Sequence, residues 1–341
     1  MTSRTVTLRT AHKVCLLLLV SAAAIYTRTA SAAEPSGGAL ADDRPRVVVS
    51  TDIGGSDPDD FQSMVHLLMY ADVLDIEGLI SSPPGKGRAK HILEVIDAYE
   101  KDYPQLKRHA RYPLPAMFRN RTKQGAVEPA PKQGFSKPTE GSRWIVERAD
   151  QSISRPSDVR PLWVLVWGSI TDVAQAVHDA PEIKRDIRVY SIGSWNTNQD
   201  RAARDYLYKE HRDLWWIECD TTFRGMYQGG RQDGDWGNRT FVAEHVKGHG
   251  ALGDLFVRKK SDIKMGDTPS VLYLLRGEPD DPTKDHWGGA FVRTGHGDNY
   301  RHDNPDPKLR EGGKAGAKTV NRWRVEYLKD WKGRIDRTAA E

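Results

Sequence analysis

The stretch RVVVSTDIGGSDPDD, residues 46–60, joins a short apolar run to four aspartates through a pair of glycines. Val47, Val48 and Val49 are β-branched, and an apolar run of this length predicts a buried strand. The glycines and the acidic residues that follow predict a turn and the start of a helix directly after that strand.

Strand-like and helix-like runs alternate along most of the sequence. Strands are predicted at 46–50, 76–81, 162–167, 187–192 and 214–218, and helices at 59–70, 87–103, 141–149, 171–178 and 201–211. This alternation favours a mostly parallel sheet flanked by helices. We therefore predict an α/β fold.

Two segments interrupt the alternation: 104–138, rich in Pro, Arg and Lys, and 229–238, rich in Gly and Asp. Loops at the C-terminal edge of an α/β sheet carry function, so both segments are expected either as rims of a cleft or as solvated connections. Near the C-terminus, residues 319–335 predict a helix that docks on the domain. Because no repeat or low-complexity linker is present, residues 33–341 are predicted to form a single domain.

The first 32 residues have the three parts of a secretory signal peptide. A positively charged start is followed by the apolar run 14–25 and by small residues at 30–32. Because that run is shorter than the roughly 20 residues of a membrane-spanning helix, we expect cleavage near Ala33. The mature protein is then secreted or periplasmic, with no attachment to a membrane. Cleavage also removes Cys15, which leaves Cys219 without a partner for a disulfide within the chain.

The formal net charge of +4 comes from the same N-terminal residues. They contain Arg4, Arg9, Lys13 and Arg28 and no acidic residue, so the 51 Lys and Arg of the chain fall to 47, which equals the 47 Asp and Glu. This balance gives no reason to expect nucleic-acid binding.

Two interpretations of the acidic residues 52–60 compete. In the first, Asp57 caps the helix, Pro58 takes its first position and the acids favour the helix dipole. That interpretation does not account for Asp52, which ends the strand. In the second, the glycines let the backbone bring the carboxylates together, and neighbouring carboxylates repel one another unless a cation neutralises them. A hard, oxygen-binding ion such as calcium meets that need.

The segment STDIGGSDPDDFQS, residues 50–63, resembles the N-terminal signature of nucleoside hydrolase-like proteins, and it is most similar to the branch described as cellulose-binding. The resemblance implies a nucleoside hydrolase-like fold and bound calcium. It also implies that Asp52 is the general base and a calcium ligand, that Asp60 is a second carboxylate ligand, and that Asp59 contacts sugar hydroxyls.

Three later segments resemble the family in the same order. WVLVWGSITD is similar to its central strand and turn, which implies that the carbonyl of Trp167 completes the calcium shell. GSWNTN is similar to the loop that supplies amides to the sugar, which implies Asn196 and Asn198 as substrate contacts. MGDTPS is similar to the late segment whose aspartate binds both metal and ribose, which implies Asp267. Together the resemblance covers roughly residues 45–335.

The sequence departs from the family pattern at positions that concern the substrate. Ser50 stands where the first Asp of an Asp-x-Asp pair is expected, and the spacer between Asp52 and Asp59 is longer than in true nucleoside hydrolases. Gly266 stands where many members have a His that helps the base leave. These departures leave the implied metal ligands in place.

Histidines and tryptophans supply further candidates. His286, His296 and His302 are each a candidate leaving-group acid, with a purely structural role as the alternative. Trp195 and Trp287 lie in Gly-rich loops and are predicted to contact substrate, because flat aromatic faces suit sugar rings. Burial in the core is the alternative for both.

The leading hypothesis is an exported, calcium-dependent hydrolase of glycosyl bonds, foremost N-glycosyl bonds of riboside type. The alternative is a non-catalytic or weakly catalytic protein that binds cellulose-type carbohydrate on the same fold. A phosphatase that uses Asp52 ranks last, because Gly54 stands where such enzymes usually have a second aspartate. The expected partner is a small-molecule glycoside or an oligosaccharide, and association into a homo-oligomer is left open.

Overall fold

The computed structural model describes residues 43–55, 57–150 and 158–339, all within one compact unit. The predicted signal peptide, residues 1–32, lies outside the described residues, so its cleavage stays a prediction. Across the described part of the chain, no helix combines the length and the apolar character needed to cross a membrane.

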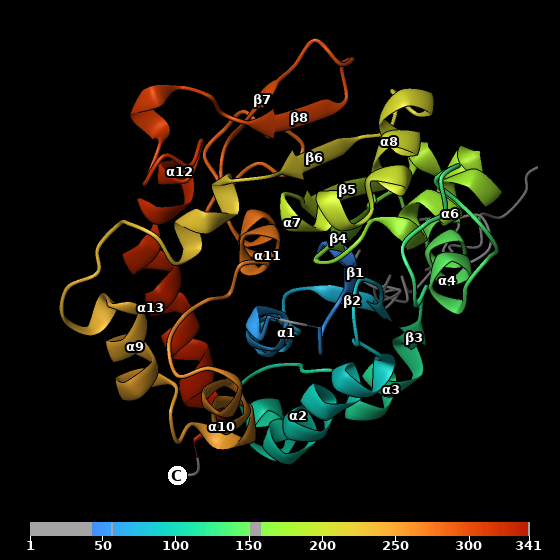
Figure 1. The fold of residues 1–341 in the computed structure, drawn as a ribbon. Helices are drawn as coiled ribbons and strands as arrows, with labels where there is room; N and C mark the ends of the chain where they lie inside the picture. The colour runs from blue at the N-terminus through green and yellow to red at the C-terminus, as the bar shows by residue number, and fades with distance from the viewer. Residues whose placement is uncertain (1–42, 56, 151–157, 340–341) are drawn as a thin grey trace, which may run out of the picture. The chain divides into compact units, whose positions relative to one another are not determined.

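Eight strands form one sheet in the order β3-β2-β1-β4-β5-β6-β8-β7 (Figure 1). The strands are β1 (Arg46–Thr51), β2 (Asp75–Ser81), β3 (Thr122–Gln124), β4 (Leu162–Val166), β5 (Ile187–Ile192), β6 (Trp216–Cys219), β7 (Phe291–Arg293) and β8 (Tyr300–Asp303). Neighbouring strands are parallel except for β7, which runs antiparallel to β8. The predicted α/β fold with a mostly parallel sheet is confirmed.

Helices cover both faces of this sheet, and each face has its own apolar core. Val47 and Val49 of β1 point into one core and Val48 into the other, which is the alternation that a strand imposes. The first core is covered by α1 (Asp59–Met69), α2 (Ala89–His109), α3 (Pro115–Arg121), α9 (Asn238–His245), α10 (Gly250–Lys259), α11 (Thr268–Leu275), α12 (Lys318–Asn321) and α13 (Arg324–Ile335). The second is covered by α4 (Glu140–Ala149), α6 (Thr171–Asp179) and α8 (Arg201–Glu210).

The order of the strands reverses beside β1. The chain passes from β1 to β2 and β3 on one side and then returns to β4 on the other side. In open α/β sheets, ligands bind at such a switch point, outside the C-terminal ends of the strands. Asp52 directly follows β1 and Trp167 directly follows β4, and Ser50 is paired with Val166 in the register of the two strands. The fold therefore brings both predicted site residues to the switch point.

Three segments differ from the sequence-based expectation. The helix predicted to end at residue 103 continues through Pro104 to His109, because Leu106 is fully buried and extends the apolar face of α2. The segment 193–198, expected to be a loop, contains the short helix α7 (Trp195–Gln199). The predicted C-terminal helix is divided into α12 and α13, and its docking on the domain is confirmed by the full burial of Trp331.

Candidate metal centre

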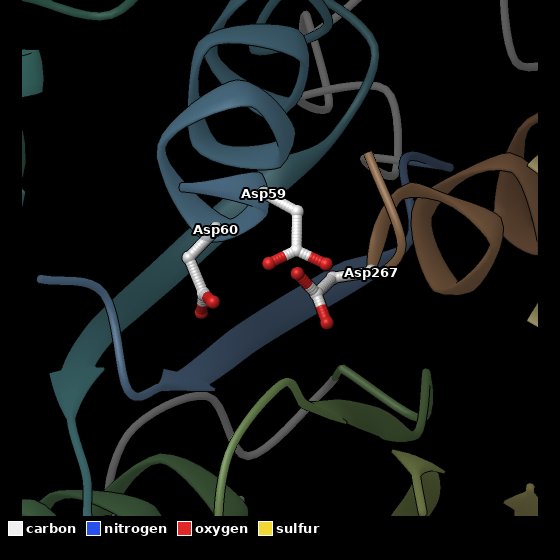
Figure 2. A group of neighbouring side chains, drawn as sticks. All are labelled: Asp59, Asp60 and Asp267. Atoms are coloured by element: carbon white, nitrogen blue, oxygen red, sulfur yellow. The ribbon is translucent and has the colours of Figure 1, made fainter. Parts of the chain in front are cut away.

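Three aspartates from distant parts of the chain meet at the switch point. Asp59 and Asp60 stand in the first turn of α1, and Asp267 directly precedes α11. Each offers one carboxylate oxygen, and these oxygens all lie within 4.8 Å of one another. Figure 2 shows the three side chains turned toward one another from the two helix starts. Oxygen ligands in this arrangement suit a hard divalent cation.

Two of the three carboxylates are buried, and among the described residues none of the three forms a salt bridge with Lys, Arg or His. The side chains of Asp60 and Asp267 are each only 3% exposed, and Oδ2 of Asp267 has no hydrogen-bond partner among the described residues. Burial and then the negative charge of Asp60 raise the pKa of Asp267 well above its usual value. Burial and the charge of Asp52 likewise raise the pKa of Asp60, against a hydrogen bond from the Thr51 hydroxyl. An uncompensated buried charge of this kind is costly without a counter-ion.

Asp52 lies next to this cluster. Its carboxyl group forms a hydrogen bond with that of Asp60. Burial raises the pKa of Asp52 to about 7, and the charges of Asp59 and Asp57 add to the rise, while the contact with Asp60 opposes it. A carboxyl group that titrates near neutral pH is suited to exchange protons with substrate or water.

The backbone of Asp267 is linked through Ser270 to Trp167, the residue that follows β4. The indole Nε1 of Trp167 donates to the hydroxyl of Ser270 at 2.7 Å, and that hydroxyl donates to the carbonyl of Asp267 at 2.7 Å. The carbonyl of Trp167, implied as a metal ligand, accepts a hydrogen bond from Nδ2 of Asn196 at 3.1 Å. A carbonyl oxygen has two lone pairs, so this contact leaves one acceptor position.

The carboxylates line a cavity of ≈ 200 Å³. Its lining consists of Asp52, Asp57, Asp59, Asp60, Trp167, Ile192, Gly193, Ser194, Trp195, Asn196, Phe223, Arg224, Tyr227, Lys264 and Asp267. We call this cavity the acidic pocket. Asp52, Asp59, Asp60, Asp267, Trp167, Trp195 and Asn196 are thus brought together as the sequence predicted.

One wall of the acidic pocket is basic, which the sequence did not indicate. Lys264 pairs with Asp57 at 2.9 Å. Arg224 donates to the hydroxyl of Tyr227 at 3.2 Å, and its Nε has no partner among the described residues. The only signal for Lys264 was its place three residues before Asp267. The capping interpretation was wrong on two positions: α1 begins at Asp59, so its N-cap is Pro58 and not Asp57, and the Asp57 side chain accepts a hydrogen bond only from the backbone N–H of Asp59, at 3.3 Å.

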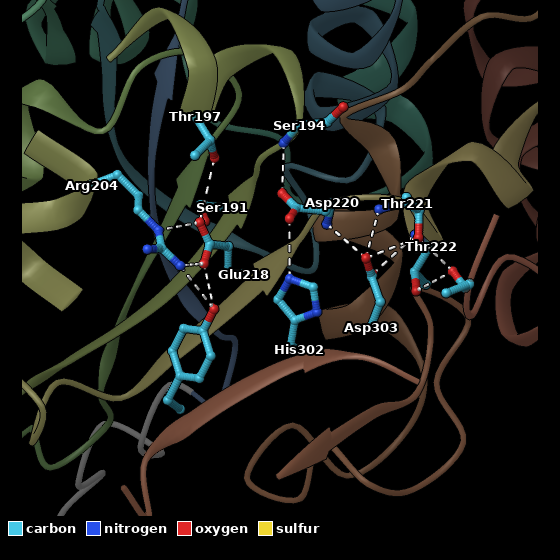
Figure 3. A network of polar contacts seen from close by, with 12 residues as sticks. Ser191, Ser194, Thr197, Arg204, Glu218, Asp220, Thr221, Thr222, His302 and Asp303 are labelled. Atoms are coloured by element: carbon cyan, nitrogen blue, oxygen red, sulfur yellow. Dashed lines mark hydrogen bonds and ion pairs between the residues drawn. The ribbon is translucent and has the colours of Figure 1, made fainter. Parts of the chain in front are cut away.

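A network behind the acidic pocket holds the turn that carries Trp195. Ser194 has φ +60° and ψ −104°, a strained conformation for a residue with a side chain. Its backbone N–H donates to Asp220 at 2.6 Å, and the other carboxylate oxygen of Asp220 contacts Nε2 of His302 at 3.1 Å. Figure 3 shows this chain of contacts and, beside it, Asp303, which accepts hydrogen bonds from the backbone that follows β6.

Several predicted site residues lie elsewhere. Asn198 is not among the residues that line the acidic pocket, and its side chain accepts a hydrogen bond from Arg201 at 2.6 Å. Trp287 is only 8% exposed and lines a different cavity. Of the three candidate histidines, none lines the acidic pocket: His286 lies in that other cavity, His296 stacks on Tyr208 and His302 binds Asp220. Short segments with Gly, Trp and His gave no information on which cavity they would face.

Gly266 is explained by its contact with Asp59. A β-carbon at this position would lie 2.6 Å from Oδ2 of Asp59. Any side chain here, including the His of the family pattern, therefore requires the Asp59 carboxylate to move. Glycine at position 266, in place of the His of the family pattern, therefore allows the Asp59 carboxylate to stay where it is.

Three solved structures resemble the fold of this protein. A solved nucleoside hydrolase-related protein from Saccharophagus degradans, described as associated with carbohydrate metabolism, has 26% sequence identity and a TM-score of 0.68, covering 87% of this chain and 72% of its own. An inosine-guanosine nucleoside hydrolase has 11% identity and a TM-score of 0.53, covering 86% of this chain and 99% of its own. The inosine-uridine preferring nucleoside hydrolase of Bacillus anthracis has 15% identity and a TM-score of 0.50, covering 86% of this chain and 100% of its own.

The two nucleoside hydrolases show similarity of fold alone. No curated protein matches the sequence. The model of the family described as "Cellulose-binding Sde182, nucleoside hydrolase-like domain" matches residues 46–291, which is more than half of the chain. The protein therefore belongs to the Sde182 nucleoside hydrolase-like family.

Proposed function

We propose that this protein is a secreted or periplasmic, calcium-dependent hydrolase of glycosyl bonds, foremost N-glycosyl bonds of riboside type. The observation that carries the proposal is the buried carboxylate cluster of Asp59, Asp60 and Asp267, with Asp52 beside it, at the switch point of the sheet. Among the described residues, none of these four aspartates forms a salt bridge, because Lys264, which lines the same cavity, pairs with Asp57 instead.

The residues present fit a calcium ion. All the charged ligands are carboxylates, which calcium prefers. Oδ2 of Asp267 has no hydrogen-bond partner among the described residues, so this oxygen is available to coordinate the ion. We assign Asp52, Asp60, Asp267 and the Trp167 carbonyl as ligands. When bound, calcium supplies positive charge that orients water and sugar hydroxyls.

Asp52 takes the proton from water in this proposal. It directly follows β1 and lines the acidic pocket beside the other proposed ligands, which places it to accept a proton from water held there. Asp59 and Asn196 hold the sugar hydroxyls. Cleavage of the bond builds positive charge on the sugar ring, and the surrounding carboxylates stabilise that charge.

The basic wall supplies proton-bearing side chains to the lining of the acidic pocket. Tyr227, Lys264 and Arg224 all line the acidic pocket, whereas the candidate histidines do not. We assign protonation or hydrogen bonding of the leaving group to this wall. Burial raises the pKa of Tyr227, so the hydroxyl keeps its proton at neutral pH.

The test is a screen of the purified protein, replete with calcium, against nucleosides and plant-type oligosaccharides. Asp52→Asn should lower the rate about a hundredfold to ten-thousandfold, the usual contribution of a general base. Asp172→Asn is the matched control, because Asp172 is also a buried carboxyl, with a pKa raised by burial to about 6, but lies outside the acidic pocket. An Asp52→Asn variant that turns over ribosides as fast as the parent contradicts the mechanism.

A second candidate function is carbohydrate binding without turnover. Trp195 is 60% exposed at the edge of the acidic pocket, where an indole face is available to a sugar ring. The family description names cellulose, and the S. degradans relative is described as associated with carbohydrate metabolism. Retention on insoluble cellulose without released product, weakened in Trp195→Ala, would favour this candidate over hydrolysis.

A further inference from the structure

One positive charge in the lining of the acidic pocket has no negative partner among the described residues. The lining contains two basic side chains, Arg224 and Lys264. Lys264 pairs with Asp57 at 2.9 Å, whereas Arg224 forms no salt bridge within the described part of the chain. Five aspartates line the same cavity, so the guanidinium is held apart from acidic side chains that are present. Because Arg224 is only partly buried, its charge is available to a molecule that enters the cavity.

The backbone that carries Arg224 is firmly held at the C-terminal edge of the sheet. Arg224 belongs to the 3₁₀ helix η2 (Thr222–Met226), which follows β6. Asp303 accepts hydrogen bonds from the backbone N–H of Thr221 at 2.8 Å and of Thr222 at 3.1 Å (Figure 3). The guanidinium itself lies over the ring of Phe223, 4.9 Å from its centre. A group placed in this way loses little freedom when it binds a ligand.

The contacts of the guanidinium leave part of its donor capacity unused. Nη1 donates to the hydroxyl of Tyr227 at 3.2 Å, and Nη2 lies 3.4 Å from the hydroxyl of Ser194. A guanidinium has five N–H donors and no acceptor, and each terminal nitrogen carries two of these donors. Both terminal nitrogens of Arg224 therefore keep one N–H for a ligand. Such a pair matches the two oxygens of a carboxylate or a phosphate, and neutral hydroxyls leave the charge itself unbalanced.

The balance of charge in the acidic pocket decides when an anion is able to enter it. The pair of Lys264 and Asp57 adds no net charge to the basic wall, so Arg224 supplies the wall's positive charge. The other aspartates of the lining repel an anion, and that repulsion is offset once the proposed calcium is bound. We therefore expect anions to bind the calcium-loaded protein.

We propose that Arg224 is a specificity-determining residue, which selects substrates that carry a carboxylate or phosphate group and binds that group through two parallel hydrogen bonds. This inference rests on the proposed function, because it names the substrate class of the same pocket. If Arg224 served only to position Tyr227 and Ser194, its loss would affect charged and neutral ligands equally. The difference in affinity between charged and neutral ligands is therefore the quantity to measure.

Two matched pairs of sugars test the proposal by binding alone. The calcium-loaded protein is titrated with ribose 5-phosphate and ribose, and with glucuronate and glucose, and binding is followed by nuclear magnetic resonance, which detects weak complexes. In at least one pair the parent should bind the anion about tenfold more tightly than the neutral sugar, the effect of a charge-assisted hydrogen bond. The pair that shows this preference distinguishes a phosphate from a carboxylate.

Three variants assign the preference to a single side chain. Arg224→Gln should bind the anion only as tightly as the neutral sugar, because the charge is lost. Arg224→Lys keeps the charge without the planar pair of donors, so it should retain part of the preference. Arg231→Gln is the matched control, because Arg231 is exposed, pairs with Asp233 and does not line the acidic pocket. It should show the full preference of the parent.

The inference is overturned if the parent binds the anion no more tightly than the neutral sugar in both pairs, or binds none of the four sugars. It is also overturned if Arg224→Gln keeps the preference of the parent, or weakens the binding of both members of a pair equally. Failure of the proposed function is seen separately, in turnover of ribosides by Asp52→Asn, and does not alter these binding results.

Discussion

At position 266 a β-carbon would lie 2.6 Å from Oδ2 of Asp59, so Gly266→Ala should push that carboxylate out of the cluster. Asp59 is not assigned as a ligand, but its carboxylate lies within 4.8 Å of those of Asp60 and Asp267, so moving its charge should lower calcium affinity about tenfold, the effect of losing a group that supports the ligands. Calorimetric titration with calcium measures the change. Gly295→Ala is the control, because a β-carbon there meets nothing within 4 Å and should leave affinity unchanged. Equal calcium affinity in Gly266→Ala and the parent would contradict the assignment of Asp59 to the cluster.

At the scale of single residues, the sequence predicted the carboxylates better than their surroundings. Asp52 and Asp60 stand in a local motif, and Asp267 in a segment that resembles the same family, so their meeting could be foreseen. Arg224 and Lys264 have no pattern of their own, and their position depends on how distant segments pack. The same is true of Trp287, because a tryptophan in a Gly-rich loop faces whichever cavity the neighbouring helices leave open.

Among the helices, α1 links the acidic cluster to a buried histidine that makes stability depend on pH. Burial lowers the pKa of His66 to about 3, with the charge of Arg334 as a further cause. The unfolded state, with a pKa near 6.5, binds a proton first on acidification, so this histidine costs stability as the pH falls below about 6.5. The cost is about 2 kcal/mol between pH 7 and pH 5.

His66→Gln should therefore reduce the loss of unfolding free energy between pH 7 and pH 5 by about that amount. Urea unfolding at the two pH values measures the difference. His109→Gln, at the exposed C-terminal end of α2, is the matched control. Its unfolding free energy should change between pH 7 and pH 5 as much as that of the parent. If the unfolding free energy of His66→Gln changed between the two pH values as much as that of the parent, the buried His66 side chain would not be the cause of the pH dependence.

The turn before α7 gives a prediction about strain. Asp220 accepts the hydrogen bond from the N–H of Ser194 that holds φ at +60°. Asp220→Ala should let the turn relax, because the strained conformation costs about 1–3 kcal/mol. Hydrogen exchange of residues 194–199 should then become about tenfold faster.

Adding Ser194→Gly to Asp220→Ala should restore part of the protection, because glycine adopts positive φ without that cost. Hydrogen exchange measured by mass spectrometry on the three proteins gives the comparison. Unchanged exchange in Asp220→Ala would mean that Asp220 does not position this wall of the acidic pocket.

At the scale of elements, the pattern of apolar residues predicted the bounds of those strands that are buried on both faces. β1, β4 and β5 are apolar runs, and their predicted bounds agree with the structure within one residue. β3 and β7 have three residues each and carry no periodic signal, and their pairing at the sheet edges depends on the strands beside them. Pro104 misled the prediction because proline normally ends a helix, whereas burial of Leu106 continues α2 beyond it.

In the whole molecule, the acidic cluster joins parts of the chain that are about two hundred residues apart. We therefore expect bound calcium to stabilise the folded state as a whole. A ligand that binds only the folded state stabilises it by about 2.7 kcal/mol at a hundred times its Kd. Calcium should therefore raise the Tm of the parent by several degrees relative to the protein in chelator.

Asp60→Asn should largely abolish the calcium-dependent rise in Tm. Without calcium, removal of one of several mutually repelling carboxylates should leave the variant at least as stable as the parent, because burial and neighbouring charge already raise the pKa of Asp60. With calcium, the variant should gain little, because a ligand is missing. Thermal unfolding of the parent, Asp60→Asn and the control Asp172→Asn, each with calcium and with chelator, gives all the comparisons. Asp172→Asn should keep the calcium-dependent rise in Tm of the parent. If Asp60→Asn kept it as well, the ion would have to bind away from the switch point of the sheet.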